Sequence, residues 1–472
     1  MQAGRPAEAV VFAERAVAGE TTCVSAHGLL ATLLLQVGRA KEADEMVTHA
    51  LQCSPGSADA YDALAHVSML LGKHERANLL YRRVVKLAPD DARFWYNLAS
   101  SERSFGRLQE AESACNRAIA LDSSHYASYL LRSELRVQSA ENNHLGELQS
   151  ALSRPGLDER ARVPLGYALA KELDDLQRYS EAFQYFQESA QIRRRHLSYS
   201  IAMDEHKIAR IQQIFTPDLI QRRARPEGSS RFIFIVGLPR SGTTLLEHIL
   251  SGLERVRSNG ETDYFARALF AAAPAGPQDV FARAALADPG RVAASYGHFA
   301  DHDSNGTRII EKLPLNYLYL GAIHRALPQA KLVLVRRSPI DACFAMYRTL
   351  FGVGYPFSYD FEDLARYHAA YDQLLEHWRK TLKEELCEVV YEELVSDPLQ
   401  TGARVAQHCG LTWNPRAIEV EKSATISMTA SAAQVRRPIY GSSSGRWRHY
   451  IQHLGPLLEA LRRHRVISAD SV

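Results

Sequence analysis

The chain has 472 residues, 46% of them hydrophobic and 23% charged, which is ordinary for globular protein and enough for two or more domains. The net charge of +2 indicates no nucleic-acid partner, and no apolar run reaches the length of about 18 residues that a transmembrane segment needs. The start of the chain lacks the pattern of a signal peptide. Six scattered cysteines are typical of reduced thiols, so we expect a cytoplasmic protein.

The first part of the chain repeats itself. Four glycines recur at one interval of 34 residues, and each is followed five residues later by an alanine. The glycines are Gly4, Gly38, Gly72 and Gly106. A 34-residue helix–turn–helix unit with small residues at the helix contacts and Gly at the turn resembles the tetratricopeptide repeat. We therefore predict a helical repeat array over residues 1–190 and a helical linker over residues 191–229.

Two questions about the array stay open. Met1 falls just before the turn of a repeat, so either the chain start is truncated or residues 3–18 form an unpaired capping helix. Such arrays present a concave face to peptides or proteins, but they also serve as rigid spacers or oligomerisation arms. The sequence supports a peptide or protein partner on the concave face and a structural role equally well.

A strand, a glycine loop and a helix are predicted over Arg231 to Leu250. An apolar run at Phe232–Val236 is followed by the loop Gly237–Thr244, which reads G-x-x-x-x-G-T-T. Loop N–H groups and the start of a helix together hold an anion. Thr243 stands where a nucleotide triphosphatase has Lys, which favours a terminal 5′-phosphate over a γ-phosphate. The predicted hydrogen-bond donors to this phosphate are Arg240, Ser241, Gly242, Thr243 and Thr244. The alternative is that the loop is a tight turn without a ligand.

Four more strands predict an α/β domain with a parallel sheet over residues 230–472. They are Val256–Glu261, a short strand that ends at a loop, and Thr307–Ile310, Lys331–Val335 and Cys387–Tyr391. Ligands of such sheets bind at the carboxyl ends of the strands, where Glu261 and Lys312 fall. A carboxylate there suits a general base, and a lysine suits a phosphate or a leaving oxygen. The alternative for Glu261 is a surface residue that caps the next helix.

A second anion site is predicted at Arg336 and Arg337, between a strand and a helix. One of the two arginines is expected to pair with Asp341, and we favour Arg337 for the ligand. Two phosphate sites suit a nucleotide with phosphates at both the 5′ and 3′ positions. The basic, Ser/Gly-rich stretch Ala433–Trp447 either folds over that nucleotide or is a disordered surface loop. We expect no metal site.

These residues resemble a known family. Pro239–Thr244 looks like the 5′-phosphosulfate loop of sulfotransferases, and Arg337–Asp341 resembles their 3′-phosphate segment. Residues from roughly 230 to 465 are similar to the tyrosylprotein sulfotransferase branch, and to bacterial proteins that join tetratricopeptide repeats to such a domain. The resemblance implies 3′-phosphoadenosine 5′-phosphosulfate as the donor, without a metal.

The resemblance also implies roles for single residues. Glu261 matches the base that activates the acceptor, Lys312 matches the family's lysine, and Tyr391 matches its adenine-side tyrosine. Ser431 and Arg446 match the late residues that close on the nucleotide. Ala345 stands where the family has Ser, which removes a hydrogen bond worth about 1.5–3 kcal/mol unless Ser338 or Arg348 replaces it.

The expected function is transfer of a sulfuryl group to an acceptor hydroxyl. Glu261 would act as the base, while Arg240 and Lys312 stabilise the charge that builds on the departing phosphate. The acceptor stays open among a peptide tyrosine, a carbohydrate and a metabolite. Two rivals are a repeat adaptor with a degenerate nucleotide-binding domain, supported by Ala345, and a magnesium-dependent nucleotide kinase, which Thr243 disfavours.

Overall fold

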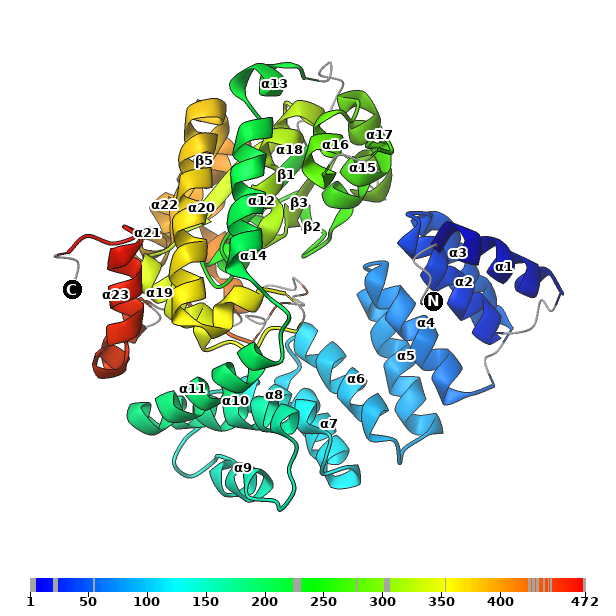
Figure 1. Ribbon diagram of the computed structural model, residues 1–472. Helices are drawn as coiled ribbons and strands as arrows, with labels where there is room; N and C mark the ends of the chain where they lie inside the picture. The colour runs from blue at the N-terminus through cyan, green and yellow to red at the C-terminus, as the bar shows by residue number, and fades with distance from the viewer. Residues whose placement is uncertain are drawn as a thin grey trace. The chain divides into compact units, whose positions relative to one another are not determined.

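The computed structural model describes most of the chain (Figure 1). The described residues are 6–19, 24–53, 56–223, 231–276, 279–300, 306–352, 354–422, 426, 429, 433–435, 438–439, 441 and 444–469. The chain divides into two compact units, Met1–Arg136 and Val137–Val472. The boundary predicted at residue 190 follows the repeat pattern, whereas this division follows packing: helices beyond Val137 pack with the sheet domain.

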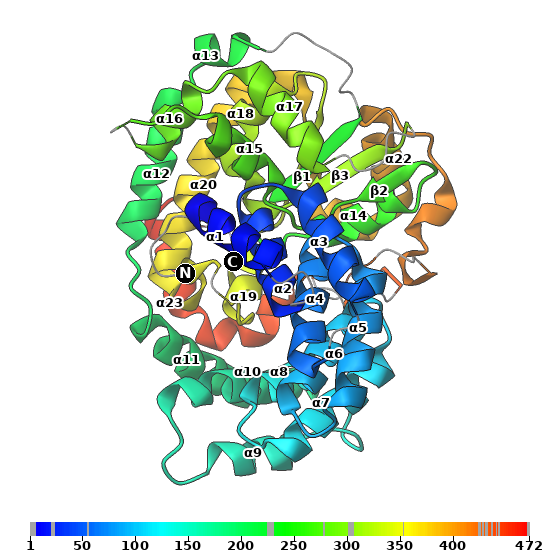
Figure 2. The same cartoon turned by 90° about the vertical axis from the view of Figure 1, so that its right-hand side faces the viewer.

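The first unit is a stack of helix pairs (Figure 2). Its turns lie at three of the four predicted glycines, Gly38, Gly72 and Gly106, whose φ angles are 83°, 72° and 76°. Only glycine adopts such angles without strain, which explains the 34-residue period. The helices are α1 (Pro6–Gly19), α2 (Val24–Gln36), α3 (Ala40–Gln52), α4 (Ala58–Leu70), α5 (His74–Leu87), α6 (Ala92–Ser104), α7 (Leu108–Leu121) and α8 (Tyr126–Glu134).

Small residues allow these helices to approach closely. A second set of alanines, Ala31, Ala65 and Ala99, also recurs every 34 residues, and all three are fully buried inside the first helices of their pairs. Two of those helices start at capping side chains, because Ser57 accepts from the N–H of Ala60 and Asp91 from that of Arg93. The predicted all-α repeat solenoid is therefore confirmed for this unit.

The second unit begins with three helices that continue the helical pattern. They are α9 (Leu145–Leu152), α10 (Glu159–Asp175) and α11 (Tyr179–Arg195). Helices α10 and α11 pack so closely that a Cβ added at Gly166 would lie 2.0 Å from Ser189 Oγ. The predicted linker region contains α12 (Ile201–Ile214), which packs along α20 (Phe361–Leu382), and α13 (Pro217–Gln221).

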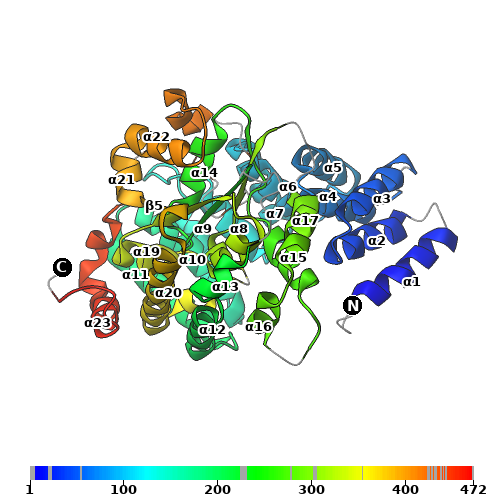
Figure 3. The ribbon, with the colours of Figure 1, turned by 90° about the horizontal axis from the view of Figure 1, so that it is seen from above.

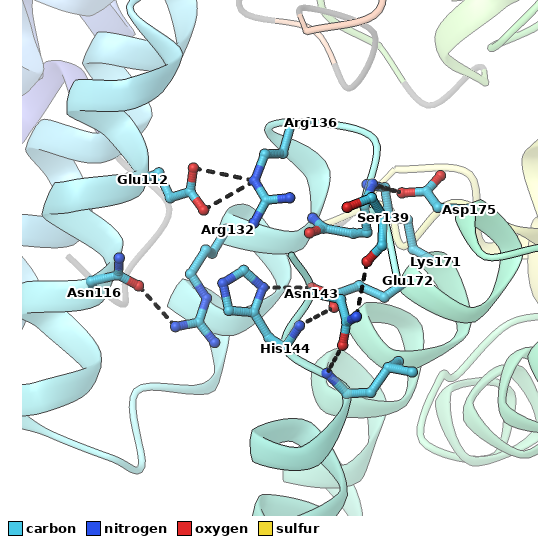
Figure 4. A network of polar contacts seen from close by, with 12 residues as sticks. Glu112, Asn116, Arg132, Arg136, Ser139, Asn143, His144, Lys171, Glu172 and Asp175 are labelled. Atoms are coloured by element: carbon cyan, nitrogen blue, oxygen red, sulfur yellow. Dashed lines mark hydrogen bonds and ion pairs between the residues drawn. The ribbon is translucent and has the colours of Figure 1, made fainter. Parts of the chain in front are cut away.

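Polar contacts within each unit are shown in Figure 4. In the first unit, Arg132 Nη1 donates to Asn116 Oδ1 at 2.8 Å, which ties α8 to α7. In the second unit, the main-chain N–H of His144 donates to the buried carboxylate of Glu172 at 2.7 Å, and the His144 ring lies 2.9 Å from its other oxygen. Glu172 thereby fixes the start of α9 against α10.

A five-stranded parallel sheet forms the centre of the second unit, with the order β2-β3-β1-β4-β5. The strands are β1 (Phe232–Gly237), β2 (Val256–Ser258), β3 (Arg308–Lys312), β4 (Lys331–Arg336) and β5 (Leu386–Val390). All five lie where the sequence predicted them, within a few residues. The predicted α/β domain with a parallel sheet is confirmed.

Alternate residues of β1 face different helices. Ile233 and Ile235 pack in one cluster with α14 (Thr243–Ser251), α21 (Tyr391–Ser396) and α22 (Pro398–His408), which lie together in Figure 3. On the other face, Phe232 meets Tyr296 of α17 (Pro289–Ala300), and Phe234 meets Phe265 of α15 (Tyr264–Ala272). The sheet is thus covered on both faces, as parallel sheets require.

The remaining helices surround this sandwich. They are α16 (Val280–Ala285), α18 (Leu320–Ala326), α19 (Pro339–Tyr347), α23 (Gly455–Arg463) and the 3₁₀ segments η1 (Pro314–Tyr319), η2 (Pro356–Tyr359), η3 (Lys383–Glu385), η4 (Pro415–Ile418), η5 (Val420–Lys422) and η7 (Arg446–His453). Helix α19 starts directly after β4 and carries Asp341 and Ala345. Among the described residues, no helix combines the length and the apolar character needed to cross a membrane.

Candidate active site

The loop between β1 and α14 is shaped by two glycines. A Cβ at Gly237 would lie 2.3 Å from the main-chain oxygen of Val335 on β4, and a Cβ at Gly242 would lie 2.3 Å from the ring of Tyr391. Gly242 (φ 97°) and Arg240 (φ 65°) both have positive φ angles. Each glycine is therefore required by a close approach, and the loop leads directly into the N-terminus of α14. Such a cradle fits a phosphate or phosphosulfate group.

The two arginines after β4 have different environments. Arg336 Nη1 lies 3.4 Å from Glu388 on β5, and its side chain is 41% exposed. Arg337 Nη1 donates to the main-chain oxygen of Arg240 at 2.9 Å, and its guanidinium lies 4.7 Å from the centre of the Tyr391 ring. Arg337 also lies 3.7 Å from Asp341, so the predicted ion pair and the predicted ligand role fall on the same residue.

A buried lysine joins two carboxylates at the end of β3. Lys312 Nζ lies 2.5 Å from Glu261 Oε1 and 3.5 Å from Glu247 Oε2, and its side chain is fully buried. Glu247 also accepts a hydrogen bond from Ser258 Oγ at 2.5 Å. Burial raises the pKa of Glu247, and the charge of Lys312 offsets this only in part. The Glu261 carboxylate is the more exposed of the two, at 33%.

Glu247 was not predicted as a site residue. It lies on α14 among Leu245, Leu246 and Ile249. A carboxylate within such an apolar helix is the signal that could have identified it. Buried carboxylates need a partner, because desolvation disfavours an isolated charge. The sequence could not name that partner, since Lys312 is 65 residues away.

One cavity brings most of the predicted residues together. Arg240, Gly242, Thr243, Thr244, Glu261, Arg337, Ala345, Tyr391 and Arg446 border it. Ser241 and Lys312 do not border the cavity. Ser241 is buried within the loop, and Lys312 contacts Glu261, which borders the cavity. Ser431 lies outside the described residues. The late segment, which is the Ser/Gly-rich stretch Ala433–Trp447, contributes Gln434, Val435, Pro438 and Ile439 to the border of the cavity. Cationic groups, residues of the glycine loop and the carboxylates of Glu261 and Asp341 therefore border a common space.

Three aromatic side chains that were not predicted as site residues also border this cavity, namely Phe344, Phe351 and Tyr355. Arg348, one of the two residues predicted to replace the contact that Ala345 lacks, borders it too. The rings of Phe351 and Tyr355 are 4.7 Å apart. Burial raises the pKa of Tyr355, and the nearby charge of Glu261 raises it further.

Family comparisons agree with the two architectures. Residues 232–415 match the sulfotransferase family. Residues 1–67, 63–126 and 168–206 match tetratricopeptide repeats. The chain is therefore a tetratricopeptide-repeat protein with a sulfotransferase-family domain. The last repeat match covers the C-terminal part of α10 and the whole of α11, which belong to the same compact unit as the sheet.

Individual relatives are distant. An uncharacterized protein of Aquifex aeolicus (strain VF5) is 28% identical over 374 residues, which make up 76% of this chain and 49% of that protein. The chain thus spans about half the length of this curated relative.

Solved structures also share only low identity with the chain. The sulfotransferase domain of the curacin biosynthetic pathway is 17% identical (50% of this chain, 95% of that one, TM-score 0.36). A sulfotransferase of Mycobacterium tuberculosis H37Rv is 14% identical (67% and 97%, TM-score 0.29). YrrB, a tetratricopeptide-repeat protein with an unusual peptide-binding site, is 17% identical (38% and 82%, TM-score 0.26). The fold assignment rests on the strands and helices described above.

Proposed function

We propose that this chain transfers a sulfuryl group from 3′-phosphoadenosine 5′-phosphosulfate to an acceptor hydroxyl. One observation carries the proposal: the glycine loop, Arg337 and Glu261 all border the same cavity. The loop suits the 5′-phosphosulfate, and Arg337 suits a second phosphate. A kinase would use a loop lysine and magnesium, but Thr243 takes the place of that lysine.

The proposed reaction assigns each group one task. The acceptor oxygen forms a bond to sulfur while the bond from sulfur to the 5′-phosphate oxygen breaks. Glu261 takes the acceptor proton, and the loop N–H groups with Arg240 and Lys312 stabilise the charge on the departing phosphate. Arg337 holds the 3′-phosphate and thereby fixes the position of the nucleotide. These roles rest on the positions of the residues and on the family resemblance.

A peptide tyrosine is the acceptor that we propose. The rings of Phe351 and Tyr355 border the same cavity as Glu261, and aromatic walls favour a phenol ring. The repeat array would then hold the peptide or protein that carries the tyrosine. A reducing, cytoplasmic setting belongs to the same proposal and is supported by five free cysteines among the described residues.

Calorimetric titration tests the donor site. Wild type and Arg337→Ala would be titrated with 3′-phosphoadenosine 5′-phosphate and, separately, with ATP and magnesium. We expect micromolar binding of the bisphosphate, its loss in the variant and no binding of ATP. Tight ATP binding would favour a kinase instead, and absence of both would leave the domain as a degenerate partner of the repeats.

The acceptor is tested by release of the bisphosphate from the donor. Three probes would be compared: a tyrosine peptide, the same peptide with serine in place of tyrosine, and N-acetylglucosamine. We expect the tyrosine peptide alone to accelerate the release. Acceleration by the sugar or by the serine peptide would overturn the tyrosine assignment while leaving the donor assignment intact.

A further inference from the structure

A buried carboxylate from the repeat helices lies beside the proposed nucleotide site. Asp174, in the last turn of α10, has a side chain that is only 2% exposed. Three groups from later in the chain meet it: Arg446 Nη2 at 2.6 Å, Arg348 Nη2 at 3.3 Å and the hydroxyl of Tyr450 at 2.5 Å. The segment that contains Asp174 matches a tetratricopeptide repeat.

Both arginines border the cavity that holds the glycine loop and Arg337. The guanidinium of Arg348 lies 5.4 Å from the centre of the Phe344 ring and 5.9 Å from that of Phe186, a residue of α11. Its Nε is buried without a hydrogen-bond partner among the described residues. Helices α10 and α11 together therefore hold Arg348 at the edge of the cavity, with donor capacity to spare.

A second path links the same cluster to Arg337. The main-chain N–H of Gly445 donates to Asp341 Oδ2 at 2.8 Å, and the other oxygen of Asp341 lies 3.7 Å from Arg337. Gly445 precedes Arg446 in the sequence, so Asp341 and Asp174 hold adjacent residues of the late segment. Both paths end at cationic groups that border the cavity.

The charges in this cluster do not cancel. Burial alone would raise the pKa of Asp174, but Arg348 and Arg446 lower it below its ordinary value, so the carboxylate is ionised. One carboxylate against two guanidinium groups leaves one positive charge. That charge lies near Ala345, where the family's hydroxyl is missing, because Ala345 and Arg348 are one helical turn apart.

We propose that Asp174 is a positioning residue that holds Arg348 and Arg446 as a second clamp for the 3′-phosphate of the nucleotide. The inference rests on the proposed donor site. It gives the repeat helix α10 a direct part in nucleotide recognition, in addition to any part that the array has in binding a partner. In this arrangement Arg348 supplies the contact that Ala345 lacks.

The test separates the 3′-phosphate from the rest of the nucleotide. Affinities for 3′-phosphoadenosine 5′-phosphate and for adenosine 5′-phosphate would be measured by calorimetry for wild type, Asp174→Asn and Arg348→Gln. A hydrogen bond to a charged group is worth about tenfold to a hundredfold in affinity. We expect each variant to lose about that factor for the bisphosphate, with the monophosphate affinity changed less than about twofold.

Asp175→Asn is the matched control. Asp175 is the next residue of α10, pairs with Lys171 at 2.7 Å and does not border the cavity. Its charge acts on Arg446 more weakly than that of Asp174, so the ratio of the two affinities should change far less than in Asp174→Asn. A structural role of Asp174 would weaken both nucleotides together or only lower the melting temperature. Unchanged ratios in the variants overturn the inference, and Arg348→Gln decides alone if Asp174→Asn does not fold. A wild type that binds neither nucleotide overturns the proposed function and this inference with it.

Discussion

Two charged clusters beside one cavity have opposite compositions. In the first, Lys312 is shared by Glu261 and Glu247, which makes one cation for two carboxylates. In the second, Asp174 is shared by Arg348 and Arg446, which makes one carboxylate for two cations. The two central groups are alike in burial, since Lys312 is fully buried and Asp174 nearly so. Only the balance of charge differs.

That balance determines what each cluster is suited to do. A surplus carboxylate beside a lysine has affinity for a proton, which is the property of a general base. A surplus guanidinium beside a carboxylate has affinity for an anion, which is the property of a phosphate site. In the proposed reaction, the fold would use the same kind of buried ion pair for the base and for the phosphate site, changing only which partner is in excess.

The largest expected effect comes from removing the surplus carboxylate of the first cluster. Glu261→Gln keeps the contact with Lys312 through the amide oxygen but removes the base. We expect turnover of the donor, followed as bisphosphate release with the tyrosine peptide, to fall by a factor of about 10²–10⁴, with nucleotide affinity nearly unchanged. Glu384→Gln, at an exposed carboxylate far along the chain, serves as the control. Full turnover in Glu261→Gln would show that Glu261 is not the general base.

Neutralising the buried member of that cluster should have a smaller effect with a different signature. The charge of Glu261 adds to burial in raising the pKa of Glu247, while the charge of Lys312 opposes them. Below its pKa the carboxyl of Glu247 is neutral, as the amide of Glu247→Gln is at every pH. The variant should therefore lose turnover by about tenfold where Glu247 is charged, because Lys312 then has one carboxylate fewer, and the kcat/KM values of the two proteins should converge as the pH falls.

The pH profile is the informative measurement for this variant, because a packing defect would lower turnover by the same factor at every pH. Ser258→Ala offers a matched comparison, since it removes the hydrogen bond to Glu247 and leaves the charge in place. Equal turnover of wild type and Glu247→Gln at neutral pH would mean that Glu247 already carries a proton there. The first cluster would then hold one charged carboxylate, and the contrast with the second would disappear.

The sequence predicted the architecture because both halves obey local rules. The interval between glycines defined the repeat, and the five apolar runs defined the strands, each within a few residues. Strand ends then placed Glu261, Lys312 and Arg337 in one crevice, since parallel strands share one carboxyl edge. Glu247 and Asp174 were missed for the opposite reason. Their partners are 65 and 174 or more residues away, and no local pattern encodes such packing.

The smallest expected effect tests the second cluster by restoring what the sequence lacks. Ala345→Ser adds a hydroxyl to a half-buried position that borders the cavity. If Arg348 already serves the 3′-phosphate, the new hydroxyl adds little, and we expect the bisphosphate affinity to rise by less than about tenfold. The affinity for adenosine 5′-phosphate should not change. Ala271→Ser, on an exposed position of α15, is the control for adding a hydroxyl.

The decisive comparison is the same substitution in the Arg348→Gln background. Two groups that serve one phosphate are not independent, so their effects should not add. Serine at position 345 should then improve bisphosphate binding more than it does in the wild type, because it replaces a contact that has just been removed. Equal gains in the two backgrounds would mean that Arg348 and position 345 act separately. The surplus positive charge around Asp174 would in that case stabilise the fold instead of binding the 3′-phosphate, and the two clusters would be alike only in being buried.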